Sequence, residues 1–188
     1  MSYLETSVAT RFPWYIRLLF RLQRRRYGRE LKPTRLWGRT PRVFLAMAAM
    51  YATLDRRSSP LPPALRSLVQ VRVSQINWCP FCLDLNTATC LKRGTTDEKL
   101  SLLPQFAEST QFDERERAAL DYAEAMTDSN RHGDASVVTK LQQHFSDDAI
   151  IELTALIAYQ NMSSKFNAAL GVPAQGFYAP RGPATGRA

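Results

Sequence analysis

Apolar residues recur every three or four positions along most of the chain, which is the spacing of amphipathic α-helices. The pattern predicts helices over residues 14–31, 41–54, 64–76, 77–92, 113–126, 134–145 and 146–170. One segment is ambiguous, because Val69, Val71 and Val73 alternate with polar residues as a strand would. An apolar helical face fits the same segment, and a proline opens it, so we predict a helix. The expected fold is all-α, with about six to eight helices.

Capping residues mark several of the predicted helix ends. We expect Asn77 to be the N-cap of the helix that carries the cysteine pair, with Pro80 tolerated in its first turn. Asp113 with Glu116 matches a capping box, and Ser146 opens the longest helix. These local signals agree with the hydrophobic pattern on where the helices begin.

A run of apolar side chains follows the predicted N-cap at Thr40. Val43, Met47, Met50 and Leu54 recur at spacings of four, three and four residues. We interpret this stripe as core filling, which is the usual role of methionine at helical spacing.

Charge divides the chain unevenly. Residues 1–60 hold 13 Lys and Arg and 3 Asp and Glu, a balance of +10, whereas the remainder holds 12 and 14, a balance of −2. We therefore expect residues 1–40 to be a basic N-terminal helical extension and residues 41–175 to be the main helical domain. We expect residues 176–188 to be a flexible tail, because its segment APRGPATGRA lacks apolar residues able to hold it.

The cluster of arginines in residues 21–29 could be a binding surface for a negatively charged partner. They would suit nucleic acid or an anionic membrane surface, but also a solvated helix face or the rim of a subunit contact. No nucleic-acid motif accompanies them, so we favour the solvated face, and we place a membrane surface behind docking on the domain or on a partner subunit.

The sequence also bears on the compartment. No apolar run approaches the ~20 residues that a membrane span needs. Glu5 and Arg11 stand where a signal peptide would need an apolar region. We therefore expect a cytoplasmic protein, in which a Cys-x-x-Cys pair is typical of catalysis or metal binding.

The stretch NWCPFCLDLN carries the candidate chemistry. Cys79 and Cys82 stand three residues apart at a predicted helix start, where free amides favour thiolate. Such a pair can close a disulfide after one sulfur is oxidised. Cys90 lies about 12 Å further along the helix, too far for a disulfide with Cys82, and is interpreted as a buried small residue. No second Cys-x-x-Cys exists, and His132 and His144 lack ligand spacing, so neither a metal nor a cofactor is expected.

Three readings of the cysteine pair remain open from the residues alone. The pair could be a working dithiol, or a redox switch of an oligomer whose basic N-terminal helix docks a partner, or a buried and inert pair. A homo-oligomer is expected in any case, because the segment ALIAYQNM is apolar around most of its circumference.

The sequence resembles the alkylhydroperoxidase-D-like branch of the carboxymuconolactone decarboxylase family. The likeness rests on LRSLVQVRVSQINWCPFCLDLN, FDERERAALDYAEAMT and FSDDAIIELTALIAYQNMSSKFNAALGVP, and spans about residues 43–173. It implies an all-helical, oligomeric fold and reduction of organic hydroperoxides. In that scheme Cys82 attacks the peroxide, Cys79 resolves the sulfenic acid to a disulfide, and a dithiol protein or small thiol restores the pair. The decarboxylase branch lacks the cysteine pair.

Two positions depart from the family's peroxidase motif. Asn86 stands where a histidine is usual, and Ser67 stands where a glutamate is usual. Neither can act as a base near neutral pH. We expect attenuated peroxidase activity, in which the Cys82 thiolate depends on the helix start and on arginines such as Arg72, with Gln70 able to orient a water. The alternative is a redox-sensing or interaction protein of the same fold without efficient peroxidase turnover.

Overall fold

The computed structural model of the chain describes residues 3–4, 11–129, 131 and 135–179. Those residues contain nine α-helices, one short 3₁₀ turn and no strand, so the all-α prediction is confirmed. The elements are α1 (Trp14–Tyr27), α2 (Lys32–Trp37), α3 (Pro41–Leu54), α4 (Pro63–Ile76), α5 (Pro80–Lys92), α6 (Asp97–Ser101), η1 (Leu103–Gln105), α7 (Glu114–Thr127), α8 (Ala135–Gln142) and α9 (Asp147–Ala169).

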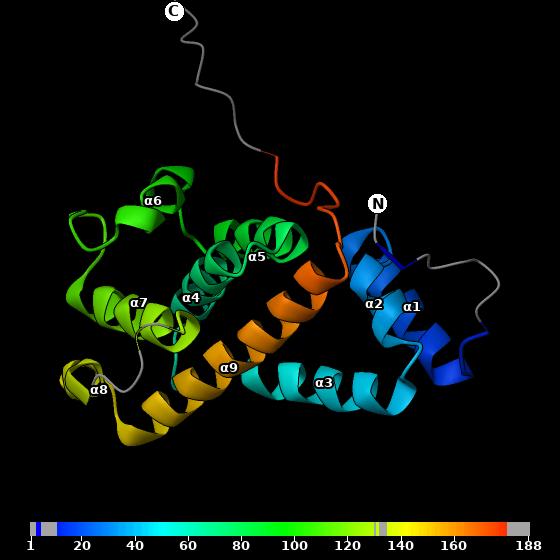
Figure 1. Cartoon of the computed structure of the whole chain (residues 1–188), viewed down its shortest axis with the longest axis horizontal. Coiled ribbons are helices and arrows are strands. Elements are labelled where there is room, and N and C mark those ends of the chain that lie inside the picture. Colours follow the sequence, from blue (N-terminus) through cyan, green and yellow to red (C-terminus); the bar gives the residue numbers. More distant parts are fainter. Residues whose placement is uncertain (1–2, 5–10, 130, 132–134, 180–188) are drawn as a thin grey trace, which may run out of the picture.

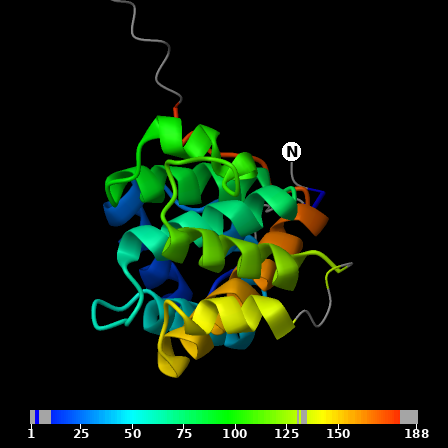
Figure 2. The same ribbon diagram turned by 90° about the vertical axis from the view of Figure 1, so that its left-hand side faces the viewer.

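The long helix α9 runs through the middle of the molecule (Figure 1). Helices α4, α5, α7 and α8 lie on one side of it, whereas α1, α2 and α3 lie on the other (Figure 1). Seen from the first side, α7 and α8 stand in front and the N-terminal helices lie behind them (Figure 2). No helix in the described part of the chain is both long and apolar enough to cross a membrane.

Helix α4 is enclosed by its neighbours and organises the main core. It packs against α5, α7 and α9, and its core side chains lie among those of Leu120, Leu153 and Ile157. Val69, Val71 and Val73 are each at most 1% exposed. The strand-like alternation therefore has a helical explanation, because a helix covered from several sides buries positions around most of its circumference.

Two capping predictions are confirmed and one is wrong. Asp113 and Glu116 form a capping box, and the Ser146 side chain accepts the N–H of Ala149. Asn77, by contrast, is the C-cap of α4, and α5 begins at Pro80 with Cys79 as its N-cap. The chain turns between the two helices at Trp78, which has a φ of 50° and is highly exposed.

Other differences from the predicted elements follow from length and packing. Helices α2 and α6, of six and five residues, were not predicted because they are too short to show a hydrophobic period. Helix α1 ends four residues earlier than expected, at a Gly28 with a φ of 74°. Asp134, the predicted start of a helix, lies outside the described residues.

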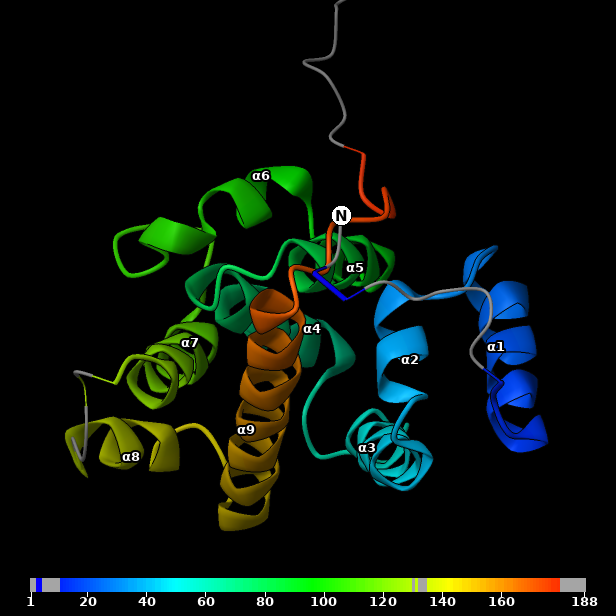
Figure 3. The same cartoon turned by 45° about the vertical axis from the view of Figure 1, so that its right-hand side comes forward.

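The predicted core stripe on α3 is confirmed in half of its positions: Leu54 is buried, and Met47 packs against two buried clusters. Val43 and Met50 are exposed, and the buried side chains of α3 are those of Phe44 and Leu54. Helix α3 lies at the outside of the molecule, where one narrow face is enough to hold it (Figure 3).

The N-terminal helices pack tightly on the rest of the chain. Ile16, Phe20, Trp37 and Phe44 form one buried cluster. The Trp37 ring stacks on that of Phe166 in α9, with ring centroids 3.7 Å apart. This contact ties the first forty residues to the central helix.

We predict that Trp37→Ala lowers the free energy of unfolding by about 3–5 kcal/mol, because it removes a buried aromatic ring and leaves a cavity. Denaturant unfolding followed by both fluorescence and circular dichroism should show one transition at lower denaturant. Two separate transitions, with the second at the wild-type midpoint, would show instead that the extension and the core unfold independently.

Candidate functional site

The cysteine pair lies where α5 begins. Cys79 and Cys82 form a disulfide, with Cα atoms 5.3 Å apart. The residues are 1% and 4% exposed, and they pack with Leu36, Phe81 and Val172. Cys90 is buried and free as predicted, and burial raises the pKa of its thiol. The pair is therefore largely screened from solvent, and its reactivity depends on what reaches it.

The free backbone N–H groups at the start of α5 lie next to the outer sulfur of the pair, that of Cys79. The backbone N–H of Cys82 donates to Sγ of Cys79 at 3.2 Å, so the capping interaction falls on Cys79. We had expected the helix start to stabilise a thiolate on Cys82, with Asn77 as N-cap, but the N-cap lies two residues later and is Cys79 itself. The amides at the tip of α5 thus favour negative charge on Cys79.

Cys82 has a different partner, Asn167 of α9. Asn167 Nδ2 donates to Sγ of Cys82 at 3.3 Å. A disulfide sulfur can only accept, so the amino end of the amide is the end that faces it. Asn167 is 1% exposed, and its Oδ1 has no hydrogen-bond partner among the residues that the structure describes. The side chain is a neutral donor placed directly on the inner sulfur.

A cavity of about 330 Å³ opens beside Cys82. Cys82, Asn86 and Asn167 line it, whereas Cys79 does not. Its apolar walls come largely from the N-terminal helices and α3, through Leu19, Leu22, Leu31, Pro33, Trp37, Phe44, Met47 and Ala48. Such a volume is at the lower end of the range of small-molecule sites, ~300–1,000 Å³. Only one sulfur of the pair can therefore meet a ligand in this cavity.

The inner wall of the cavity is polar but carries no carboxylate or imidazole. Asn86 Nδ2 donates to Ser74 Oγ at 3.0 Å, and Gln160 Nε2 donates to the same oxygen at 3.2 Å. Gln70 Nε2 donates to Gln160 Oε1 at 3.4 Å. Asn86 therefore reaches the amide network rather than a sulfur. These amides orient dipoles around the cavity but cannot take up a proton near neutral pH.

Two tyrosines of the cavity remain protonated. Burial, with a smaller effect of Asp55, raises the pKa of Tyr51 to about 12. Burial also raises the pKa of Tyr159 well above its usual value. Both hydroxyls are therefore hydrogen-bond donors at neutral pH and not bases.

Ser67 lies outside the cavity, contrary to its predicted place in the site. Arg93 donates to Ser67 Oγ at 2.9 Å and to both carboxylate oxygens of Asp55 at 2.7 Å. The short serine side chain is thereby engaged by a buried ion-pair cluster, which also includes Arg66. Ser67 thus connects α4 to this ion-pair cluster, and its part in the chemistry of Cys82 stays a prediction.

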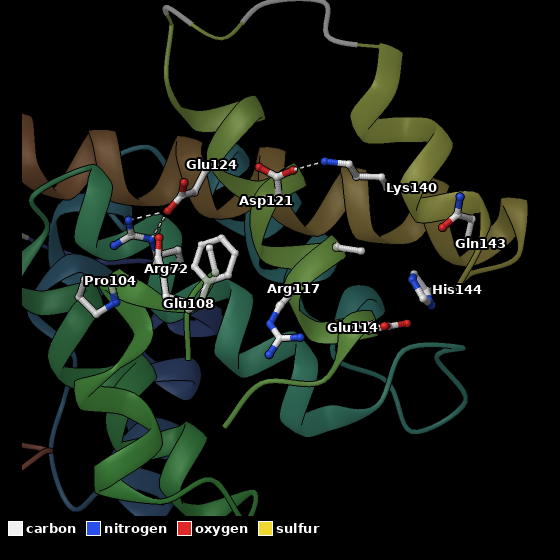
Figure 4. Close-up of a pocket in the computed structure, with 13 residues that line it drawn as sticks. Arg72, Pro104, Glu108, Glu114, Arg117, Asp121, Glu124, Lys140, Gln143 and His144 are labelled. Atoms are coloured by element: carbon white, nitrogen blue, oxygen red, sulfur yellow. Dashed lines mark hydrogen bonds and ion pairs between the residues drawn. The ribbon is translucent and has the colours of Figure 1, made fainter. Parts of the chain in front are cut away.

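Arg72 is also remote from the cysteine cavity, so its predicted role beside the thiolate is wrong. Its Nε donates to Glu124 at 2.7 Å, and the pair lines a separate groove of about 650 Å³ (Figure 4). His144 lines the same groove, in which Lys140 pairs with Asp121. The charged groups there largely satisfy one another.

A C-terminal segment, residues 172–179, covers the cysteine pair from outside; we call it the strap. Asp84 of α5 accepts the backbone N–H groups of Gln175 and Tyr178, each at 2.7 Å. The Phe177 ring meets that of Phe81 edge to face. Residues 176–179 are thus held in place, although the sequence assigned them to a flexible tail, and residues 180–188 lie outside the described residues.

The comparisons with known proteins agree with this fold. The model of the carboxymuconolactone decarboxylase family matches residues 41–125. The protein YnjA of Escherichia coli is 40% identical over 167 residues, which cover 89% of this chain and 92% of YnjA. The chain therefore belongs to the carboxymuconolactone decarboxylase family, and its structural neighbours are consistent with the alkylhydroperoxidase-D-like branch.

Two solved structures illustrate what the fold is used for. The alkylhydroperoxidase AhpD core of a peroxidase-related protein from Ralstonia eutropha is 19% identical, with a TM-score of 0.83 and 94% of each chain covered. The debrominase Bmp8 is 23% identical, with a TM-score of 0.76 and 87% of each chain covered. A cysteine-to-alanine variant of Bmp8 was solved with 2,3,4-tribromopyrrole. At these identities the likeness shows a shared fold.

Two features of the site were not predicted from the sequence: Asn167, and the contribution of the N-terminal helices to the cavity. Gln160, Ser164 and Asn167 follow one another on one face of α9 and are all buried. The available signal was this row of polar residues at helical spacing, which continues the face of the buried Leu153 and Leu156. Nothing in the local pattern of residues 14–37 showed that they close a cavity over Cys82, because that contact depends on the tertiary fold.

We predict that Asp84→Ala speeds thiol labelling of Cys79 in the reduced protein, because it leaves two strap N–H groups without their acceptor at a cost of ~1–3 kcal/mol each. The rate with a water-soluble maleimide measures this. Asp97→Ala, which removes only the contact with the Tyr178 hydroxyl, is the control and should change labelling less. Equal labelling in wild type and Asp84→Ala would show that the strap does not limit access.

We predict that Asn167→Leu slows alkylation of Cys82 by about 10–100-fold at neutral pH, because a hydrogen bond to a charged group contributes ~1.5–3 kcal/mol. The measurement uses iodoacetamide on Cys79→Ser protein. Asn86→Leu is the matched comparison and should have a smaller effect, since Asn86 bonds Ser74. A larger effect of Asn86→Leu than of Asn167→Leu would reverse the assignment.

Proposed function

We propose that the protein is a thiol-dependent peroxidase that reduces organic hydroperoxides through Cys82 and Cys79. The observation that carries the proposal is that the two sulfurs differ in their position relative to the cavity. Cys82 lines the cavity, while Cys79 lies outside it and within disulfide reach of Cys82. An oxidant in the cavity therefore meets Cys82, and the oxidised Cys82 meets Cys79.

The reaction balances in three steps. The Cys82 thiolate attacks the outer oxygen of R–O–O–H, an S–O bond forms as the O–O bond breaks, and the alkoxide takes a proton to leave as an alcohol. Cys79 then attacks the sulfur of the Cys82 sulfenic acid, and water leaves as the disulfide forms. A dithiol reductant, a protein or a small thiol, supplies two electrons and two protons to restore the pair.

The neutral surroundings of Cys82 explain why we expect slow turnover. Asn86 and Ser67 stand where the family's peroxidase motif has an imidazole and a carboxylate. Loss of general acid–base help costs ~10²–10⁴ in rate. Asn167 offsets part of this loss, because its hydrogen bond to Cys82 Sγ stabilises the thiolate, although the amide cannot take up or release a proton.

The debrominase Bmp8, which has the same fold, suggests a second candidate substrate for the cysteine pair, a brominated aromatic compound. A thiol pair can in principle reduce a carbon–bromine bond as well as an O–O bond, and the apolar walls of the cavity would admit either compound. We favour the hydroperoxide because the amides of the inner wall suit a polar O–O–H group. The two chemistries are separable by the product, alcohol or bromide.

We predict that reduced protein mixed with an excess of cumene hydroperoxide loses two thiols faster than free cysteine, and that Cys82→Ala abolishes the reaction. Cys79→Ser should lose one thiol and retain the first step. A parallel sample with 2,3,4-tribromopyrrole should release no bromide. A peroxide rate no faster than that of free cysteine, or bromide release without peroxide reduction, would overturn the proposal.

A further inference from the structure

The cavity beside Cys82 has a single charged residue in its lining, Arg26 of α1. No aspartate or glutamate lines it. Arg26 forms no ion pair with a carboxylate among the described residues, whereas its neighbour Arg24 pairs with Glu30. A cation without a carboxylate partner at the edge of an apolar cavity is an available site for an anionic group.

The guanidinium of Arg26 lies over the ring of a second residue that lines the cavity. It lies 5.5 Å from the centroid of the Tyr27 ring, and Tyr27 also lines the cavity. Its charge is also one of those that act on the hydroxyl of Tyr51, another lining residue. The positive charge therefore lies beside two residues of the cavity lining, Tyr27 and Tyr51.

The cavity has two polar regions with an apolar region between them. Arg26 comes from α1, on the outer side of the molecule, whereas Cys82 comes from α5, close to α9 (Figure 3). Leu19, Trp37 and Met47 contribute to the apolar wall. A ligand that satisfies all three regions has an anionic end, an apolar body and a polar reactive end.

The volume limits the size of that body. A cavity of ~150 Å³ holds a benzene molecule, and this cavity has about 330 Å³. It therefore has room for a phenyl ring with a short chain, but not for a whole phospholipid. The balance of +10 over residues 1–60 also favours the approach of an anion.

We propose that the substrate is a hydroperoxide of an apolar carboxylic acid, whose carboxylate binds Arg26 while its O–O–H group lies at Cys82. The hydroperoxide part rests on the proposed function, but the selection of an acid by Arg26 does not. The carboxylate takes no part in the redox step; it places the organic body so that the peroxide reaches the sulfur.

The test uses ligands without a peroxide, so it is independent of turnover. Binding of 4-phenylbutyrate and of the uncharged 4-phenyl-1-butanol to the disulfide form is measured by titration calorimetry. We expect the acid to bind about three- to tenfold more tightly, because a partly exposed arginine makes a modest charge-assisted bond. Arg26→Gln should remove this preference.

Arg25→Gln is the matched control, because Arg25 is exposed on the same turn but does not line the cavity. It removes the same charge and should leave the preference for the acid intact. Equal binding of acid and alcohol by wild type, or an equal loss in the two variants, would overturn the inference. Reduction of cumene hydroperoxide by wild type would in that case still uphold the proposed function.

Discussion

The enclosure of α4 is the constraint on which the rest of the structure depends. A helix that packs against α5, α7 and α9 needs hydrogen-bond partners for most of the polar groups that it buries. Arg66 donates to the backbone oxygen of Leu54, Ser67 accepts from Arg93, and Ser74 receives the amides of Asn86 and Gln160. These bonds fix α5 and α9 relative to α4, and hence they place Cys82 next to Asn167.

In this arrangement the start of α5 and the access through the cavity favour different sulfurs of the cysteine pair. The helix start favours a charge on Cys79, which the strap covers, whereas the cavity and Asn167 favour reaction at Cys82. Stabilising a thiolate is of little use where no oxidant arrives. Access therefore decides the order of the two sulfurs, and the strap held by Asp84 maintains the difference in access.

Much of the fold followed from local pattern, and much of the site did not. The helical period, the capping box at Asp113 and the N-cap at Ser146 are local signals, so they were predictable. The start of α5 was placed wrongly because both Asn77 and Cys79 can cap a helix. The positive φ of Trp78 separates α4 from α5, so that Cys79 and not Asn77 is the N-cap of α5. Partners distant in sequence, such as Asn167 for Cys82 and Arg93 for Ser67, depend on packing that no local pattern contains. The homo-oligomer expected from the segment ALIAYQNM of α9 stays a prediction.

The most direct test of this account is to find which sulfur of the reduced wild-type protein reacts first. The native protein is given a substoichiometric amount of benzyl bromide, an apolar alkylating agent small enough for the cavity, and the modified peptide is mapped by mass spectrometry. If access through the cavity determines which sulfur reacts first, the first adduct is on Cys82. Replacement of Trp78, which lies outside the cavity, should leave the adduct on Cys82. A first adduct on Cys79 would show that the helix start governs reactivity and would contradict the account.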